Sequence, residues 1–454
     1  MFYTSLRNPL SYEEKLNQMQ EDALFDVADP SLSYGLKDTE EVSIPDPSIF
    51  HDIRSKQAPP KVPKVFMSNK CIFNCAYCGC RASHETNSRY CNSPKELAEM
   101  AIQQAKNNGH GVFLTSAIYQ NADYTEELII ETLRIMRNEL FYNGYIHAKI
   151  MPGTDPLLIQ KAAQYANRLS VNIEVANNSG FERIAKQKNK TNILAPMQYI
   201  SNIVQVAKQN RSPSNPIIAT SQTTQLMAGS TNETDRIIMN LSGALYKKYR
   251  LSRVYYTAFH YTHPAKGYEL PLTTTPLWRV KRLYQADRLI QLYGFSYDDI
   301  TPEHDPNLIE SLDPKMNWAI RNIHLFPIEI NTADYDQLLR IPGIGLTYAK
   351  RIIAAKKYGT ITHQTLRKIG VSLKKSSYFI TCNGKYEGGN LLENPELLKD
   401  FFSELDNTID INKSNNINNC GISNDNFNKN TIVNVNDNYK TCKNSNKIET
   451  VTSM

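Results

Sequence analysis

Short apolar runs alternate with amphipathic helical segments between about residue 63 and residue 295. This alternation is typical of consecutive βα units, and it predicts an α/β fold built on a parallel sheet. Six runs have the length and composition of strands: "KVFMS", "GVFLTS", "YIHAKIM", "RLSVNIEV", "PIIATSQTTQLMAG" and "RVYYTAFHY". Six strands with intervening helices predict a partial, TIM-like (β/α)6 barrel.

Two of the intervening segments begin with helix-start signals. In "NSPKELAEMAIQQAKNNG", Ser93 is placed as the N-cap, with Pro94 at the first helical position and Glu96 completing a capping box. The segment after the fifth strand repeats this pattern with Ser230 and Glu233. We therefore expect a crossover helix to begin at each of these points.

Several of the predicted strands carry polar residues on one face. In "LSVNIEV", Ser170, Asn172 and Glu174 alternate with apolar residues, and "IHAKI" places His147 and Lys149 on one face. A parallel strand that is buried on both faces is almost continuously apolar. We expect the polar faces to line the barrel interior, and the alternative is the exposed face of an edge strand.

The stretch "NKCIFNCAYCGC" places Cys71, Cys75 and Cys78 within eight residues. A 4Fe-4S cluster has four irons that usually take Cys thiolates, so one loop could hold three corners and leave the fourth iron open. The alternative, structural zinc, requires four ligands, usually as two separated pairs, and no second pair follows here. Cys80 and Cys91 are treated as spare thiols.

Cys71, Cys75, the aromatic Tyr77 and Cys78, directly after a predicted first strand, resemble the motif of the radical S-adenosylmethionine (SAM) superfamily. In that superfamily SAM chelates the open iron, and an electron from the reduced cluster cleaves it to a 5'-deoxyadenosyl radical. The resemblance implies that the three cysteines hold a catalytic 4Fe-4S cluster and that SAM is the second cofactor. It also implies a low-potential electron donor such as a flavodoxin or ferredoxin.

The same resemblance suggests residues that contact SAM at the ends of the second and third strands. Thr115 and Ser116 occupy the position at which the superfamily usually binds the SAM amino group. Lys149 is a candidate partner for the SAM carboxylate.

Further SAM contacts are implied at the ends of the fourth and fifth strands. Asn172 and Glu174 stand where the ribose hydroxyls usually find partners, and Gly229 resembles the turn against the adenine. Tyr77 is expected to cover the adenine, and its alternative is a packed aromatic side chain.

Charge is distributed very unevenly along the chain. The formal net charge is +6, yet residues 337 to 386 contain no Asp or Glu. Ten basic residues lie in this stretch: Arg340, Lys350, Arg351, Lys356, Lys357, Arg367, Lys368, Lys374, Lys375 and Lys385. The pattern favours a polyanionic partner over a merely solvated basic face.

Within this stretch, "LLRIPGIGLTYAKRII" resembles the helix-hairpin-helix motif. Gly343, Ile344 and Gly345 form the expected turn, and the free N–H groups of the following helix would bind a phosphate without reading sequence. Lys350 and Arg351 would reinforce that contact. The alternative for such a hairpin is a protein–protein module.

The order of cluster loop, barrel and basic hairpin resembles a family of DNA modification or repair radical SAM proteins, over about residues 10 to 386. The resemblance implies a DNA substrate and a uracil-DNA-glycosylase-like partner protein. Because a base inside a duplex cannot reach a barrel interior, we expect the target base to be flipped or single-stranded. Two alternatives stay open, namely a radical SAM enzyme that modifies tRNA and a non-catalytic Fe-S DNA-binding redox sensor.

Four regions are expected along the chain. Residues 1–60 form an N-terminal helical extension and connector, and residues 61–312 form the radical SAM barrel. Residues 313–386 form a small all-α helix-hairpin-helix domain that binds nucleic acid, and residues 387–454 form a linker and a disordered Asn-rich tail. No apolar run approaches the ~20 residues that span a bilayer, so we expect a cytoplasmic protein that does not contact membranes.

Overall fold

The computed structural model describes residues 11–25, 62–84, 89–108, 111–210, 216–260, 267–268 and 270–405. Its first element is the helix α1 (Tyr12–Phe25), which packs near β1 (Lys64–Phe66). Lys15 of α1 forms an ion pair with Glu96, at 2.6 Å between Nζ and Oε1. The N-terminal helix is therefore present, and the expected connector up to residue 60 lies outside the described residues.

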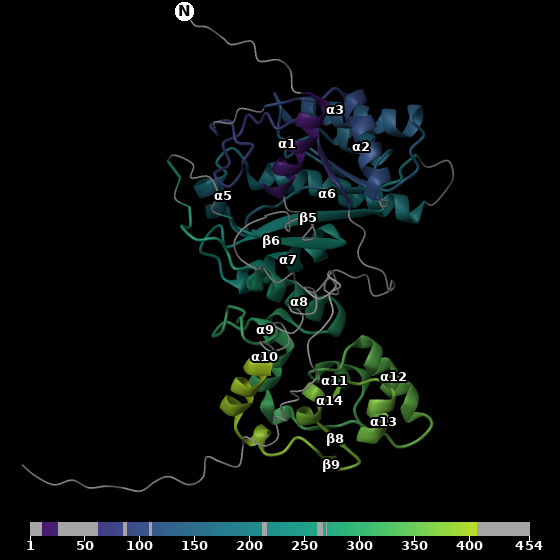
Figure 1. Ribbon diagram of the computed structural model, residues 1–454, viewed down its shortest axis with the longest axis vertical. Coiled ribbons are helices and arrows are strands. Elements are labelled where there is room, and N and C mark those ends of the chain that lie inside the picture. The colour runs from purple at the N-terminus through teal and green to yellow at the C-terminus, as the bar shows by residue number, and fades with distance from the viewer. Residues whose placement is uncertain are drawn as a thin grey trace, which may run out of the picture. The chain divides into compact units, whose positions relative to one another are not determined.

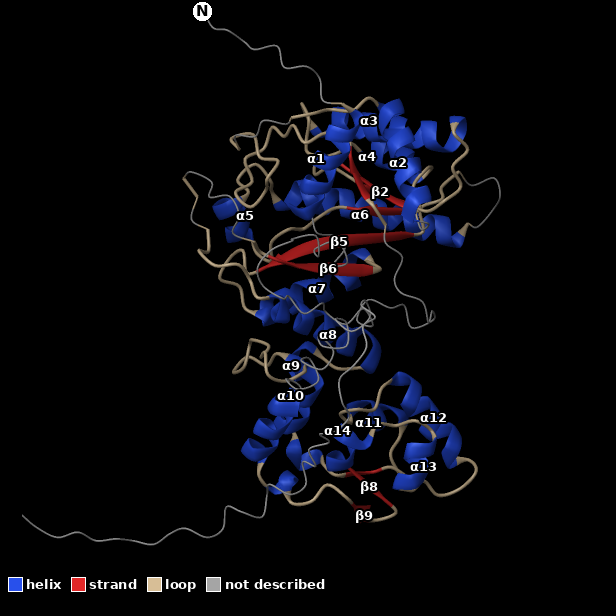
Figure 2. Ribbon diagram, in the orientation of Figure 1, coloured by secondary structure: helices blue, strands red, loops and turns tan. Residues whose placement is uncertain are grey.

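Six parallel strands form a half-barrel (Figures 1 and 2). The strands are β1, β2 (Val112–Thr115), β3 (Ile146–Lys149), β4 (Arg168–Ser170), β5 (Ser221–Ala228) and β6 (Arg253–Ala258). Each strand pairs in parallel with the next strand along the chain. The order lacks the reversal of a doubly wound sheet, so it confirms the predicted partial barrel.

Helices connect the six strands. They are α2 (Pro94–Asn108), α3 (Ala122–Arg134) with the π-helical turn η2 (Ile135–Glu139), α4 (Pro156–Ala163), α5 (Asn178–Ile184), α6 (Lys190–Gln209), α7 (Asp235–Tyr249) and α8 (Leu277–Tyr293). The Glu96 N–H donates to Ser93 Oγ at 3.3 Å, which confirms the N-cap of α2. Within the described ranges, no helix combines the length and apolar character needed to cross a membrane.

The strand register gathers polar side chains on one face of the sheet. Lys149 pairs with Ser170, and Ser170 pairs with Thr223. Further along the same face, Asn172 Nδ2 donates to Gln225 Oε1 at 3.3 Å. The alternate residues of β2, β3 and β4 are wholly buried apolar side chains that join the hydrophobic core. The predicted polar row therefore exists, and it lies on the face opposite to the apolar core.

The part of the chain after α8 combines short helices with a small sheet. Its helices are α9 (Tyr297–Ile300), α10 (Pro314–Arg321), η3 (Ile323–Leu325), α11 (Tyr335–Arg340), α12 (Leu346–Lys356), α13 (His363–Lys368), α14 (Leu373–Ser376), η4 (Ser377–Phe379) and η5 (Leu391–Glu393). Its strands are β7 (Ile328–Glu329), β8 (Ile380–Cys382) and β9 (Lys385–Tyr386), in the order β7-β8-β9. The expected all-α character is therefore wrong, because strands of two or three residues are too short to show an alternating pattern.

A helix over residues 395–405 replaces part of the expected linker and tail. Leu398 and Phe402 of this helix are wholly buried. The Phe402 ring centroid lies 5.4 Å from that of Tyr378 and 5.9 Å from that of Phe379. The expected linker therefore contains a helix, since these apolar side chains find a partner surface. Residues 406–454 lie outside the described residues.

Candidate functional site

The three cysteines of the motif lie on the loop that follows β1. Cys75 is buried, Cys71 and Cys78 are half-buried, and none forms a disulfide. Burial raises the pKa of Cys75 to about 12, against the opposing charge of Lys188 and with the help of Cys78 and Cys71. A hydrogen bond from the Cys80 side chain is the main cause that lowers the pKa of Cys78 to about 7. The three sulfur atoms therefore lie within electrostatic reach of one another.

The arrangement of donors fits three corners of a cluster better than a single metal ion. Among the described residues, no three His, Cys, Asp or Glu side chains are grouped closely enough to hold one ion. The ligands of a 4Fe-4S cluster need not converge in this way, because each thiolate binds a different iron. Three cysteine thiols on one loop provide the usual donors for such a cluster.

The cysteine loop is fixed at several points. Its Ile72 N–H donates to the Ile118 carbonyl at 2.9 Å, and its Ala76 N–H donates to the Ile184 carbonyl at 2.7 Å. The Arg89 guanidinium donates to four backbone carbonyls, those of Asn69, Cys80, Arg81 and His84. Segments after β2 and at the end of α5 therefore hold the loop in place, together with Arg89.

The two spare thiols lie on either side of this anchoring arginine in the sequence. Cys80 is buried and interacts with Cys78. Cys91 is half-buried, its backbone pairs with Ser68 in an isolated bridge, and its thiol donates to the Asn92 carbonyl at 3.8 Å. Both residues thus have structural contacts of their own.

Lys188 links the cysteine loop to the segment after β4. Its Nζ donates to Tyr77 Oη and to Glu174 Oε1, each at 3.0 Å. The same Nζ lies 5.7 Å from the Tyr77 ring centroid. Sequence reasoning missed Lys188, because nothing in "IAKQKNK" separates it from the exposed Lys186 and Lys190.

Glu174 has an unusual backbone at the point where the polar row reaches the cysteine loop. Its φ is +64°, a left-handed conformation that is uncommon for a non-glycine residue. Its N–H donates to the Gln225 carbonyl at 2.9 Å, and its carbonyl accepts from the Met227 N–H at 2.8 Å. Burial by itself would lower the pKa of Lys188. The negative charge of Glu174 and other nearby groups nevertheless raise this pKa well above its usual value. Lys188 is therefore held in its charged form.

The other predicted cofactor contacts lie at neighbouring strand ends. Thr115 is wholly buried at the end of β2, and Ser116 Oγ donates to the Ala117 carbonyl at 2.6 Å. Lys149, at the end of β3, helps to lower the pKa of Cys78 and so lies within electrostatic reach of the cysteine loop. The structure thus brings Lys149, Tyr77 and Glu174 together around the cysteines, while the Ser116 hydroxyl donates to the backbone carbonyl of the next residue.

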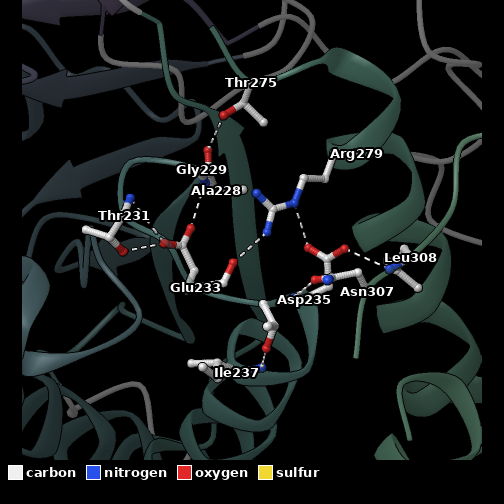
Figure 3. Close-up of polar contacts among 11 residues, drawn as sticks. Ala228, Gly229, Thr231, Glu233, Asp235, Ile237, Thr275, Arg279, Asn307 and Leu308 are labelled. Carbon is white, nitrogen blue, oxygen red and sulfur yellow. Dashed lines mark hydrogen bonds and ion pairs between the residues drawn. The ribbon is translucent and has the colours of Figure 1, made fainter. Parts of the chain in front are cut away.

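The turn after β5 is held by a buried carboxylate (Figure 3). Gly229 has φ of +81°, and a Cβ at this position would lie 1.9 Å from Thr275 Oγ1. Its N–H donates to Glu233 Oε1 at 2.6 Å, and the Thr231 N–H donates to Glu233 Oε2 at 3.1 Å. Only glycine fits at residue 229, because both the positive φ and the close approach of Thr275 exclude a side chain.

The expected capping box of Ser230 and Glu233 is wrong. The helix α7 starts at Asp235, with Thr234 as its N-cap, because Glu233 bonds to the turn before it instead. Asp235 accepts from Arg279 Nε at 2.7 Å (Figure 3). These contacts form one wall of an open pocket beside the predicted Gly229 turn.

The predicted phosphate-binding turn joins α11 to α12. Gly343 is exposed with φ of +84°, Ile344 is buried, and Gly345 is the N-cap of α12 without a side-chain hydrogen bond. Lys350 and Arg351 are exposed on α12, and Arg351 Nη1 donates to the Ile369 carbonyl at 3.0 Å. Arg351 therefore connects the first helix pair, α11 and α12, to the second, α13 and α14.

Part of the positive charge in the acid-free stretch is neutralised by acids from outside it. The ion pairs are Arg340 with Asp299 at 3.2 Å, Lys375 with Asp313 at 3.1 Å and Arg367 with Glu387 at 3.4 Å. Five lysines remain exposed to solvent: Lys350, Lys357, Lys368, Lys374 and Lys385. The basic surface is therefore smaller than the sequence suggests.

Comparisons with known proteins were made at the levels of family, sequence and structure. No family model matches the chain, and no curated protein matches it. Three similar solved structures are methylornithine synthase (PylB), the FeFe-hydrogenase maturase HydG from Carboxydothermus hydrogenoformans, and coproporphyrinogen III oxidase (HemN) from Escherichia coli, which is described as a radical SAM enzyme.

The likeness to these structures is partial. The TM-scores are 0.37, 0.39 and 0.30, at sequence identities of 18%, 16% and 13%. The matches cover 50%, 51% and 52% of this chain. They cover 63%, 52% and 52% of the matched chains, so the chain spans less than two thirds of the length of each.

Proposed function

We propose that the chain is a radical SAM enzyme that modifies or repairs DNA. One observation carries the proposal: three cysteines on a single loop after the first strand of a six-stranded half-barrel, joined through Tyr77 and Lys188 to Glu174. The loop is anchored on both sides, so its thiols are held in place before any cofactor binds. Such preorganisation is what a site for a reactive cofactor requires.

Cys71, Cys75 and Cys78 would hold a 4Fe-4S cluster. Such a cluster, with SAM as the second cofactor, would supply radical chemistry that removes a hydrogen atom from the substrate. Lys188 and Tyr77 keep the cysteine loop next to Glu174, and the positive charge of Lys188 favours the thiolate form of Cys75 that a cluster would require.

The polar row of the half-barrel would bind SAM. Lys149 provides a cation for the carboxylate, Thr115 and Ser116 provide groups near the amino end, and Asn172 offers an amide to the ribose. Glu174 would have to accept hydrogen bonds from the ribose while it keeps its ion pair with Lys188. The Gly229 turn borders an open pocket that could take the adenine.

The five exposed lysines and the turn of Gly343 to Gly345 support DNA as the substrate class, since a basic surface attracts a polyanion. A base inside a duplex cannot reach the row of polar side chains, so the target base would be flipped or single-stranded. A flavodoxin or ferredoxin as electron donor, a uracil-DNA-glycosylase-like partner and a cytoplasmic location belong to the same proposal.

The decisive experiment measures cofactor chemistry and substrate change separately. The protein is reconstituted anaerobically with iron and sulfide, reduced with dithionite and given SAM, and 5'-deoxyadenosine is measured by mass spectrometry. Damaged and undamaged oligonucleotides are then added, and their nucleosides are analysed. A Cys75→Ala variant serves as the control that lacks one corner of the cluster. Full cluster content without 5'-deoxyadenosine would favour the Fe-S redox sensor instead.

Exposed lysines suit tRNA as well as DNA, so a radical SAM enzyme that modifies tRNA is the second candidate. Competition binding with duplex DNA, single-stranded DNA and tRNA separates the two. We expect DNA to compete more strongly. A clear preference for tRNA would make RNA, and not DNA, the proposed substrate.

A further inference from the structure

A pocket of about 460 Å³ lies where β5 ends and where α7 and α8 begin. Its walls are the Gly229 turn, the residues before and at the start of α8, and the pair Asn307 and Leu308. The volume falls within the range of about 300 to 1,000 Å³ that is typical of small-molecule sites. Because the six strands are parallel, the carboxyl ends of β1 and β5 lie at the same end of the half-barrel. The pocket therefore lies at the end that carries the cysteine loop.

The charged side chains of the pocket wall are paired with one another and with the backbone (Figure 3). Arg279 donates from Nε to Asp235 Oδ1 at 2.7 Å and from Nη2 to the Glu233 carbonyl at 2.9 Å. The second oxygen of Asp235 accepts from the Leu308 N–H at 2.9 Å. Both oxygens of Glu233 accept from backbone N–H groups of the Gly229 turn. Among the described residues of the wall no charge is left unpaired, which favours a neutral ligand over an anion or a cation.

Trp278 gives the pocket its aromatic surface. It is the second residue of α8, and its side chain is half-buried. Within the described residues this side chain makes no hydrogen bond, contacts no other aromatic ring and is not packed against the hydrophobic core. A tryptophan normally packs its ring and finds a partner for its N–H within its own protein. The indole is therefore available to a ligand.

The remaining hydrogen-bonding groups of the pocket are neutral. Asn232 and Thr273 are exposed, and neither side chain has a hydrogen-bond partner within the described residues. Asn307 uses Oδ1 to accept from the Asp235 N–H at 3.1 Å, which leaves its NH₂ group available. An asparagine amide carries a donor and an acceptor side by side, and this pattern is complementary to the edge of a nucleobase.

We propose that this pocket binds the target nucleobase, which stacks on Trp278 and hydrogen-bonds through its edge to Asn232 and Thr273. A nucleobase is a neutral flat ring with a polar edge, so it matches an aromatic face, neutral hydrogen-bonding groups and a wall without unpaired charge. The proposed contact of SAM involves only the Gly229 turn. The adenine of SAM nevertheless has the same chemistry as a target base, so the test must separate the two sources. The choice of a base from a nucleic acid rests on the proposed function.

The first test locates a bound base by tryptophan fluorescence. The chain has two tryptophans, and the second, Trp318, is only 5% exposed. The ligands are deoxyadenosine, deoxyguanosine, deoxycytidine, thymidine and deoxyuridine, which carry no phosphate and so do not depend on the basic surface. We expect at least one of them to quench the reconstituted protein in a saturable way. Trp318→Phe should keep this response and Trp278→Phe should lose it. Quenching that persists unchanged in Trp278→Phe, or no response to any nucleoside, would overturn the proposal.

The second test measures the affinity for the same nucleosides by calorimetry. Trp278→Leu should weaken binding about tenfold, because it removes the stacking surface. Tyr199→Leu, which removes an exposed aromatic side chain from α6, is the matched control and should bind like the wild type. Asn232→Ala changes an exposed position, so it should weaken binding without an effect on folding, which circular dichroism verifies. Equal affinities of Trp278→Leu, Asn232→Ala and the wild type would contradict the assignment.

Two further measurements separate the source of the base and the two proposals. The titration is repeated on the unreduced protein with saturating SAM. Retained nucleoside binding supports a target base, whereas competition assigns the pocket to the adenine of SAM and overturns the inference. The 5'-deoxyadenosine formed without substrate reports the proposed radical chemistry by itself. If it forms while no nucleoside binds, only the inference about the pocket fails. If nucleoside binding depends on Trp278 but no 5'-deoxyadenosine forms, only the radical SAM proposal fails.

Discussion

At the scale of single residues, the ion pair of Lys188 and Glu174 is the contact that organises the candidate site. The two side chains are 12% and 7% exposed, and their charged atoms lie 3.0 Å apart. A buried pair of this kind adds little net stability over an apolar pair, but removing one partner leaves a buried charge without compensation.

Lys188→Met should therefore lower the free energy of unfolding by about 3 kcal/mol, because Glu174 would keep a charge in a buried position. Urea denaturation measures the effect. The double variant Lys188→Met/Glu174→Gln should recover much of the loss, and Lys190→Met, an exposed lysine two residues away, should be neutral. Equal stability of Lys188→Met and the wild type would show that the pair is not essential.

Glu126 on α3 makes stability depend on pH. Burial raises its pKa from an ordinary value of 4.5 to about 8, while the Met151 N–H, which donates to Oε2 at 3.1 Å, opposes the shift. Between these values the folded protein keeps a proton that the unfolded chain releases. The free energy of unfolding must therefore fall as the pH rises from about 4.5 to about 8.

Glu126→Gln should remove this dependence, because an amide keeps the acceptor for Met151 and does not titrate. Its stability relative to the wild type should increase by up to about 1.4 kcal/mol for each pH unit in that window. Urea denaturation at pH 5, 6.5 and 8 measures the difference. A constant difference between the two proteins would mean that Glu126 titrates normally.

The cysteine loop and Lys188 show how much the sequence reveals about single residues. Cys71, Cys75 and Cys78 were predicted because their spacing along the chain is itself the signal. Lys188 was missed, because its contacts with Tyr77 and Glu174 span 111 and 14 positions. Local patterns carry no information about such distant partners.

At the scale of elements, local signals predicted the strands and the start of α2, but not the start of α7. Ser93 and Pro94 have no strong competitor for their role, so α2 begins where the pattern indicates. Glu233 had a better partner in the Gly229 turn, so α7 begins at Asp235. The start of α2 was therefore predicted by its N-cap Ser93, since the carboxylate of Glu96 pairs with Lys15.

The helix over residues 395–405 allows a stability prediction at the same scale. Phe402→Ala should cost about 3 kcal/mol, since the ring is wholly buried against Tyr378 and Phe379. Leu397→Ala, an exposed residue on the same helix, should change stability by less than about 0.5 kcal/mol. Thermal and urea denaturation compare the two variants. Similar effects at both positions would contradict the packing described here.

At the scale of the whole molecule, the alternation of strand and helix patterns sufficed to predict six parallel strands in chain order. The small sheet of β7, β8 and β9 was not predicted, because β7 and β8 pair across about 50 residues of helical chain. The size of the basic surface was also overestimated, since Asp299, Asp313 and Glu387 come from outside the acid-free stretch.

Arg340 of α11 connects the half-barrel segment to the helices that follow it. Its guanidinium carbon lies 3.9 Å from the Phe295 ring centroid and 5.1 Å from that of Trp318, and it pairs with Asp299. Arg340→Gln should cost about 2 kcal/mol through the lost cation–π contacts and ion pair. Hydrogen exchange should become faster around β7 to β9 and stay unchanged in α2.

The control for this prediction is Arg183→Gln, which removes an exposed arginine from α5. It should leave exchange unchanged in both regions. If exchange also stayed unchanged in Arg340→Gln, the contacts of Arg340 would be dispensable for joining the two regions.

The half-barrel stops after six strands, and in the described residues β1 and β6 do not pair with each other. A closed ring admits a ligand only through its two mouths, so a long polymer would have to be threaded or cut. An unclosed sheet imposes neither requirement, because a single protruding group can enter from the side while the rest of the chain runs past. A substrate much longer than the sheet could therefore be sampled at an internal position and released intact.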